Sequence, residues 1–115
     1  MSAPVLAVFL WAIAQVETGG VAPARPGPAG ETGRWQITPA VRAAHAKGLS
    51  DREVAERHVR WLERNLGQGG TEPTIRNLAL AWNAGLTATI YGKAPRRAHD
   101  YAQRVENLCN ERLNP

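Results

Sequence analysis

Residues 3–17, APVLAVFLWAIAQVE, form an apolar run that ends in a carboxylic acid and is followed by glycines at 19–20. Its large apolar residues fall on nearly every face of a helix: Val5, Leu6, Val8, Phe9, Leu10, Trp11, Ile13 and Val16. A helix that is apolar all round is packed through the middle of a domain. Ser2 suits the N-cap, Pro4 suits the first turn, and the glycines end the helix. We therefore expect a buried first helix with Glu17 at its C-terminal end.

The same run has the length of a signal-peptide core, but its flanking charges do not fit one. No Lys or Arg precedes it, and the first positive charge of the chain is Arg25. The run is also shorter than the roughly 20 apolar residues that a membrane span needs. We expect no stable membrane insertion and see no export signal.

The segment after this helix is rich in glycine and proline. Residues 19–33 contain five glycines and three prolines, which prevent a helix from continuing. Residues 30–33, Gly-Glu-Thr-Gly, predict either the tip of a small β-hairpin or an irregular loop.

The rest of the chain has the pattern of a helical protein. A capping box at Ser50–Glu53 predicts the start of one helix, and Gly85 the end of another. The expected helices after the first cover about 39–47, 51–66 and 74–84, with a last one starting near Pro95. At 115 residues the chain is expected to form a single mainly α domain, 1–115. We assign Trp11, Trp61 and Cys109 to its core.

Composition narrows the functional class without choosing it. A net charge of +4 and a pI near 10.0 suit an anionic partner, whether nucleic acid, cell-wall polymer or membrane surface. The histidines show no metal spacing: His58 falls on a packed helix face, and His45 and His99 are read as surface residues. No phosphate-binding glycine loop and no Ser or Cys nucleophile motif is present. We expect no cofactor and no metal.

Glu17 differs from the other acidic residues in its surroundings. Of the ten acidic residues, eight lie in amphipathic helices or polar loops, whereas Glu17 directly follows an apolar helix. Apolar surroundings raise the pKa of a carboxyl group, which a general acid requires near neutral pH. The alternative is a helix-terminal glutamate with its side chain in water.

Four segments, in this order, resemble the soluble lytic transglycosylase catalytic domain, a family related to goose-type lysozymes. That family has a helix ending Glu-Ser, then Gly-Leu-Met-Gln, then Ala-Tyr-Asn-Ala-Gly, and late in the chain Tyr-x-x-x-Val. The four motif segments here are Ala14–Thr18, Gly33–Pro39, Ala81–Gly85 and Tyr101–Val105. The resemblance covers most of the chain and implies a lysozyme-like fold.

The resemblance also implies an activity. Glu17 would protonate the β-1,4 bond between N-acetylmuramic acid and N-acetylglucosamine in peptidoglycan, and then act as base to give a 1,6-anhydro product. Gln36 and Asn83 match polar positions of the family's cleft, and Tyr101 would steady the carboxyl group or contact substrate. Trp35 and Trp82 replace the family's Met and Tyr. They fit either sugar-stacking platforms or core residues.

Two alternatives remain open at this point. A hydrolytic lysozyme or chitinase-like enzyme would need a second carboxylate, for which Glu31 is the candidate, although it also fits a solvated turn. A protein of another class would be a non-catalytic module that binds glycan or nucleic acid. Acidic residues interleaved through 51–63 argue against nucleic acid.

The expected place of action is the bacterial cell wall or periplasm. Without an export signal, the route there would be phage-type release, dedicated secretion or a leader absent from this sequence. The sequence does not indicate which oligomeric state the protein adopts.

Overall fold

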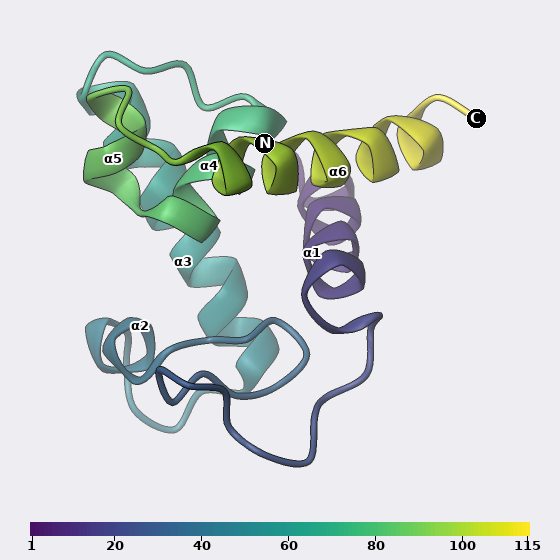
Figure 1. The fold of residues 1–115 in the computed structure, drawn as a ribbon, viewed down its shortest axis with the longest axis vertical. Coiled ribbons are helices and arrows are strands. Elements are labelled where there is room, and N and C mark those ends of the chain that lie inside the picture. Colours follow the sequence, from purple (N-terminus) through teal and green to yellow (C-terminus); the bar gives the residue numbers. More distant parts are fainter. The chain divides into compact units, whose positions relative to one another are not determined.

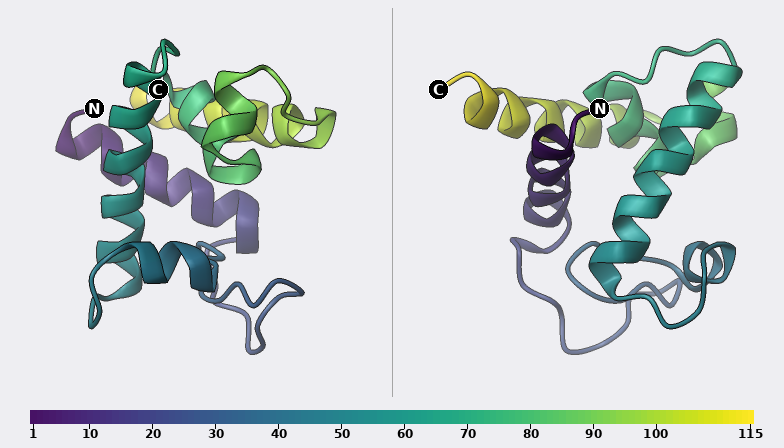
Figure 2. Two further views of the ribbon diagram at one scale, coloured as in Figure 1. Left: turned by 90° about the vertical axis from the view of Figure 1, so that its left-hand side faces the viewer. Right: turned by 180° about the vertical axis from the view of Figure 1, so that it is seen from behind.

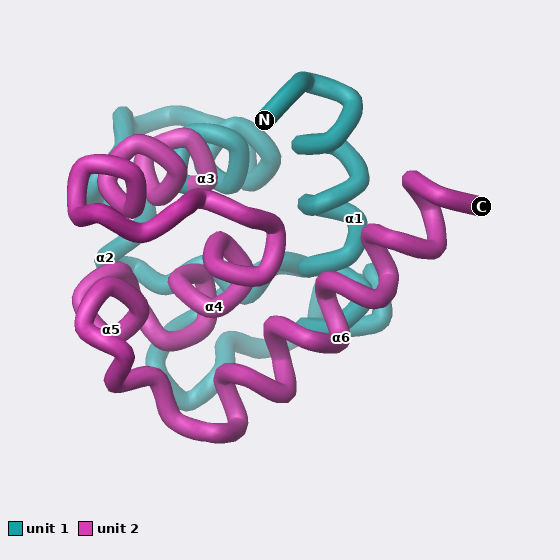
Figure 3. Tube along the Cα trace, turned by 90° about the horizontal axis from the view of Figure 1, so that it is seen from above, with its two compact units in different colours: residues 1–58 teal, residues 59–115 magenta.

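The computed structural model describes residues 1–115, of which 63% are helical and none lies in a strand. The chain divides into two compact units, Met1–His58 and Val59–Pro115 (Figure 3). The helices are α1 (Ala3–Thr18), α2 (Pro39–Ala44), α3 (Asp51–Gln68), α4 (Ile75–Ala84), α5 (Leu86–Ile90) and α6 (Arg96–Leu113) (Figure 1). The boundary falls within α3, so that helix contributes residues to both units. The predicted mainly α class is confirmed.

In the first unit, α1 forms as its sequence predicts. The hydroxyl of Ser2 caps its N-terminus by accepting from the backbone N–H of Val5 at 3.3 Å. Gly19 ends the helix in the left-handed conformation, with a φ of 67°. The buried residues share one broad side of the helix: Leu6, Phe9, Leu10, Ala12, Ile13 and Ala14. The other side of α1 carries the exposed Ala3, Pro4 and Ala7 and the half-buried Val8 and Trp11, so the helix packs into a core on one broad side and not, as the sequence predicted, on nearly every face.

The glycine- and proline-rich segment between α1 and α2 is irregular, and the hairpin alternative is not what forms. A single antiparallel bridge joins Thr32 to Ile37, closed by hydrogen bonds of 3.0 Å in each direction. The turn inside this bridge is 33–36, not the 30–33 expected from the sequence. Gly30 and Gly33, with φ of 77° and 79°, need the freedom of glycine to bend the chain here.

One arginine of α2 ties this segment to the start of α3. Arg42 of α2 donates to the hydroxyl of Thr32 at 2.8 Å and to Asp51, the first residue of α3, at 2.6 Å. The start of α3 has the predicted capping box: Ser50 and Glu53 each accept from the other's backbone N–H at 3.2 Å. Bridge, α2 and the start of α3 are therefore joined through side chains on three elements.

In the second unit, α4 packs against α6, and α5 follows α4 after one residue (Figure 1 and Figure 2). Arg76 of α4 bridges the two helices by donating to Gln103 at 2.7 Å and Glu106 at 3.3 Å on α6. Gly85, with a φ of 94°, separates α4 from α5. The sequence reading missed α5, because a five-residue helix shows too little periodicity to be recognised. The sequence also predicted that α2 runs to about residue 47. The helix ends at Ala44, because the backbone of His45 has a β conformation.

Burial of the aromatic and sulfur-containing residues agrees only in part with the expected core. Cys109 is fully buried as predicted, and burial raises the pKa of its thiol to about 11. Trp61 was expected in the core but is 38% exposed, since the buried face of α3 runs through Val59, Leu62 and Leu66. Trp11 is half-buried. None of the helices is both long and apolar enough to cross a bilayer.

Candidate active site

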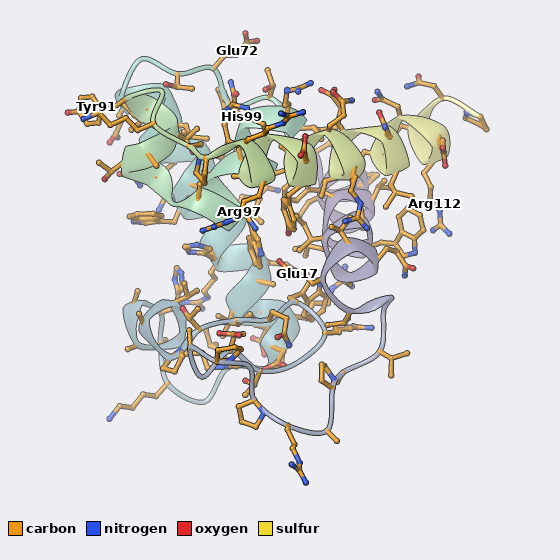
Figure 4. The ribbon with its side chains drawn as sticks, viewed as in Figure 1. Glu17, Glu72, Tyr91, Arg97, His99 and Arg112 are labelled. Atoms are coloured by element: carbon orange, nitrogen blue, oxygen red, sulfur yellow. The ribbon has the colours of Figure 1, made fainter.

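Glu17 lies in the last turn of α1 and is half-buried (Figure 4). The chain turns away directly behind it. The backbone N–H groups of Gly19 and Gly20 donate to the carbonyls of Gln15 and Ala14 at 3.0 and 3.1 Å. These bonds satisfy carbonyl groups that a helix end would otherwise leave open. They fix the conformation of the backbone on the C-terminal side of the carboxylic acid.

Thr18, the residue after Glu17, joins the first motif segment to the second. Its hydroxyl lies 2.8 Å from the carbonyl oxygen of Arg34 and 3.1 Å from that of Ala14, one turn back in the helix. Both contacts are made by the same hydroxyl group. Its function is visible here: it holds the segment that carries Gln36 against the end of the helix that carries Glu17.

Trp35 provides a second connection between the same two segments, from inside the core. Its indole N–H donates to the carbonyl of Leu10 at 2.8 Å, and the side chain is 3% exposed. The guanidinium of Arg34 lies 4.2 Å from the centre of its ring. Of the two roles considered for Trp35, the structure shows the core role. A ring buried to this degree has no free face on which a sugar could stack.

Gln36 has the only positive φ outside glycine, 51°. Its side-chain amide donates to the carbonyl of Gly33 at 2.7 Å, and its backbone N–H donates to the same oxygen at 3.1 Å. A non-glycine residue in the left-handed region costs roughly 1–3 kcal/mol and persists where the surroundings impose it, which is frequent at functional sites. The two bonds to Gly33 impose it here. Gln36 is therefore held in one orientation within the second motif segment.

Glu31 takes part in its own loop. One carboxylate oxygen accepts from the backbone N–H of Ala29 at 3.0 Å, and its carbonyl accepts from that of Gly27 at 2.8 Å. The side chain folds back over Gly27, where a Cβ atom would collide with it. This is the arrangement of a turn-stabilising carboxylate.

The remaining site candidates belong to the second unit. Asn83 is exposed in the last turn of α4, Trp82 beside it is half-buried, and Tyr101 on α6 is 8% exposed. The candidates therefore form two groups. Glu17, Gln36, Trp35 and Glu31 lie in the first unit, and Trp82, Asn83 and Tyr101 lie in the second.

A histidine pair was not found from the sequence. Nε2 of His45 lies 3.3 Å from Nδ1 of His58, with the rings 5.5 Å apart and nearly perpendicular. Burial lowers the pKa of His58 to about 4, helped by the charge of His45. Burial, with a smaller effect of Arg57, lowers that of His45. His45, predicted on the surface, is thus half-buried against His58. The residues are 13 positions apart on different elements, so no spacing rule could have paired them.

Comparison with known proteins adds no further assignment: no family model, no curated protein and no solved structure matches this chain.

Proposed function

We propose that this protein cleaves the glycan strands of bacterial peptidoglycan, with Glu17 as the catalytic acid and base. The observation that carries the proposal is the hydrogen bond from the Thr18 hydroxyl to the Arg34 carbonyl, 2.8 Å long. It joins two segments that the family resemblance picks out independently and that lie 16 residues apart in the sequence. The buried Trp35–Leu10 bond, also 2.8 Å, supports the same pairing. A chance resemblance would not require these segments to meet.

The proposed reaction needs one carboxyl group. Glu17 donates its proton to the oxygen of the β-1,4 bond as the bond from that oxygen to C1 of N-acetylmuramic acid breaks. The resulting carboxylate then takes the proton of the C6 hydroxyl of the same sugar, and O6 bonds to C1. The products are a 1,6-anhydro sugar and a free C4 hydroxyl, and Glu17 is again protonated. Gln36, Asn83, Tyr101 and Trp82 are proposed to contact the strand.

Non-hydrolytic cleavage is preferred over hydrolysis because of Glu31. A hydrolase of this kind employs a second carboxylate to activate water or to attack the sugar. The only candidate for it accepts a hydrogen bond from the Ala29 N–H of its own loop at 3.0 Å. This use of Glu31 favours the route that the single carboxyl group of Glu17 can complete.

A decisive experiment incubates the intact protein with purified peptidoglycan and identifies the soluble products by mass spectrometry. Anhydro-muropeptides are expected from the wild type and from Glu31→Gln, and none from Glu17→Gln. Glu72→Gln, at an exposed position in the loop before α4 and outside the four motif segments (Figure 4), is the matched control and should behave as the wild type. Far-UV circular dichroism verifies that each variant is folded.

Each other outcome points to a different function. Reducing-end muropeptides that disappear in Glu31→Gln would make the protein a hydrolase. Cleavage by a folded Glu17→Gln variant would reject the proposal. No product from the folded wild type, together with retention on wall sacculi, would favour a glycan-binding module. A salt-sensitive gel shift with duplex DNA would instead favour nucleic acid.

A further inference from the structure

The contact between His45 and His58 joins the end of α2 to α3 within the first unit. Both histidines lie outside the four motif segments in sequence, and nothing in the proposed reaction uses them. His45 is the residue at which α2 ends, and its ring is half-buried, as is that of His58. Water can therefore approach the pair, although both rings are partly enclosed by protein.

The two facing nitrogen atoms have the separation of two ligands on one metal ion. Zinc binds histidine nitrogen at about 2.0–2.1 Å, and the tetrahedral angle then puts two such nitrogens roughly 3.3–3.4 Å apart. The distance between Nε2 of His45 and Nδ1 of His58 is 3.3 Å. We propose that these two atoms bind a zinc-class divalent transition metal ion, with water completing its coordination. This proposal is independent of the catalytic function above.

The protonation state of the pair suits this role. A metal ligand must be a neutral imidazole, and the lowered pKa values of His45 and His58 keep both rings neutral at pH 7. Without metal, one ring donates its N–H to the other. On binding, the proton of that ring moves to its second nitrogen, so both rings present a lone pair to the ion. No net proton is released in this exchange, in contrast to binding by a thiol or by a protonated histidine.

The chain supplies two ligands at this position. No group of three or more His, Cys, Asp or Glu residues comes together in the structure. The expected site is consequently of modest affinity, with water in its remaining positions. Its effect would be mechanical, since it would fasten the end of α2 to α3. Arg42, three residues before His45, already joins α2 to Asp51, the first residue of α3, at 2.6 Å.

The test titrates zinc chloride into the intact protein at pH 7 and follows binding by isothermal calorimetry. The chain provides its own controls. His99 is exposed on α6 (Figure 4), and His99→Gln leaves the same number of histidines as His45→Gln. The thiol of Cys109 is buried with a pKa of about 11 and does not compete for zinc. We expect one ion per chain for the wild type and for His99→Gln. His45→Gln should bind at least about tenfold more weakly.

A spectroscopic measurement on the wild type keeps the proposal testable if His45→Gln does not fold. Two-dimensional NMR of the imidazole groups should show zinc shifting the resonances of His45 and His58 while those of His99 stay unchanged. Three results would overturn the proposal: no zinc binding by the wild type, undiminished binding by folded His45→Gln, or shifts confined to His99.

Discussion

Lowering the pH from 7 to 5 is expected to weaken the fold through His58. Burial, and to a smaller extent the charge of His45, lowers the pKa of His58 from 6.5 to about 4. Because the folded pKa lies below the unfolded one, the folded state binds the proton less readily than the unfolded state. The stability is therefore present above pH 6.5 and is lost progressively as the pH falls from there toward 4.

The difference between the two pKa values sets the size of the loss. At about 1.36 kcal/mol per pKa unit, the loss approaches about 3 kcal/mol well below pH 4, of which about 2 kcal/mol falls between pH 7 and 5. The pKa of His45 is also lowered, so its contribution has the same sign. Glu53 and Glu63 have lowered pKa values as well, but the stability they contribute is lost only as the pH falls below about 4.5. The chosen window therefore isolates the histidine pair.

The measurement is urea unfolding at pH 7, 6 and 5, followed by circular dichroism with EDTA present to remove metal. The wild type and His99→Gln should each lose about 2 kcal/mol of unfolding free energy between pH 7 and 5. His58→Gln should lose less than half of that. The reasoning is refuted if the wild type is equally stable at pH 7 and 5, or if folded His58→Gln keeps the full loss.

Three further predictions concern the segment joined to the end of α1. Thr18→Val removes the hydroxyl bonded to the Arg34 carbonyl and should lower the rate of glycan cleavage by about tenfold or more. Thr18→Ser keeps the hydroxyl and should keep the rate. The release of product from labelled peptidoglycan measures the rate of each variant. Trp35→Phe leaves the buried Leu10 carbonyl without its indole partner and should lower the unfolding free energy by about 1–3 kcal/mol in urea unfolding. Gln36→Gly relieves the φ of 51° but loses the side-chain bond to Gly33, so stability should change by less than about 1 kcal/mol while cleavage falls. A Gln36→Gly variant with full activity would show that the amide does not contact substrate.

The parts of the fold that could be predicted are those in which local sequence dictates local structure. The capping box of α3 is an example, because its two partners are three residues apart and each satisfies a backbone group of the other. The start of α1 at Ser2 and its end at Gly19 follow from the same kind of rule. Such signals act within one helical turn and do not depend on the rest of the chain.

The interactions that organise the candidate site could not be predicted in this way. The Thr18–Arg34 bond spans 16 residues and the Trp35–Leu10 bond spans 25, across an irregular segment with no periodicity. The resemblance indicated that these segments belong to one site, but not which atoms connect them. It left the role of Trp35 open, because a tryptophan suits both a core and a sugar-binding surface. Only burial distinguishes the two.

Trp61 shows a different limit. Its spacing fits the apolar face of α3, but the centre of the buried face is occupied by Leu62. Because adjacent residues on a helix are about 100° apart, Trp61 then lies at the edge of that face. With Leu62 at 1% exposure, the large ring of Trp61 remains 38% exposed. Periodicity identifies the face of a helix, whereas the width of the buried stripe depends on the neighbours.

The burial of Cys109 has a practical consequence for labelling. With a pKa of about 11, its thiol is ionised in roughly one molecule in 3,000 at pH 7.5, and only the thiolate reacts with maleimides or iodoacetamides. A second cysteine placed at the exposed Val21 or Arg25, in the irregular segment, would therefore carry a fluorophore almost exclusively. The protein without the added cysteine, treated with the same reagent, would measure the background labelling of Cys109. Single molecules could then be followed on isolated wall sacculi without first removing the native thiol.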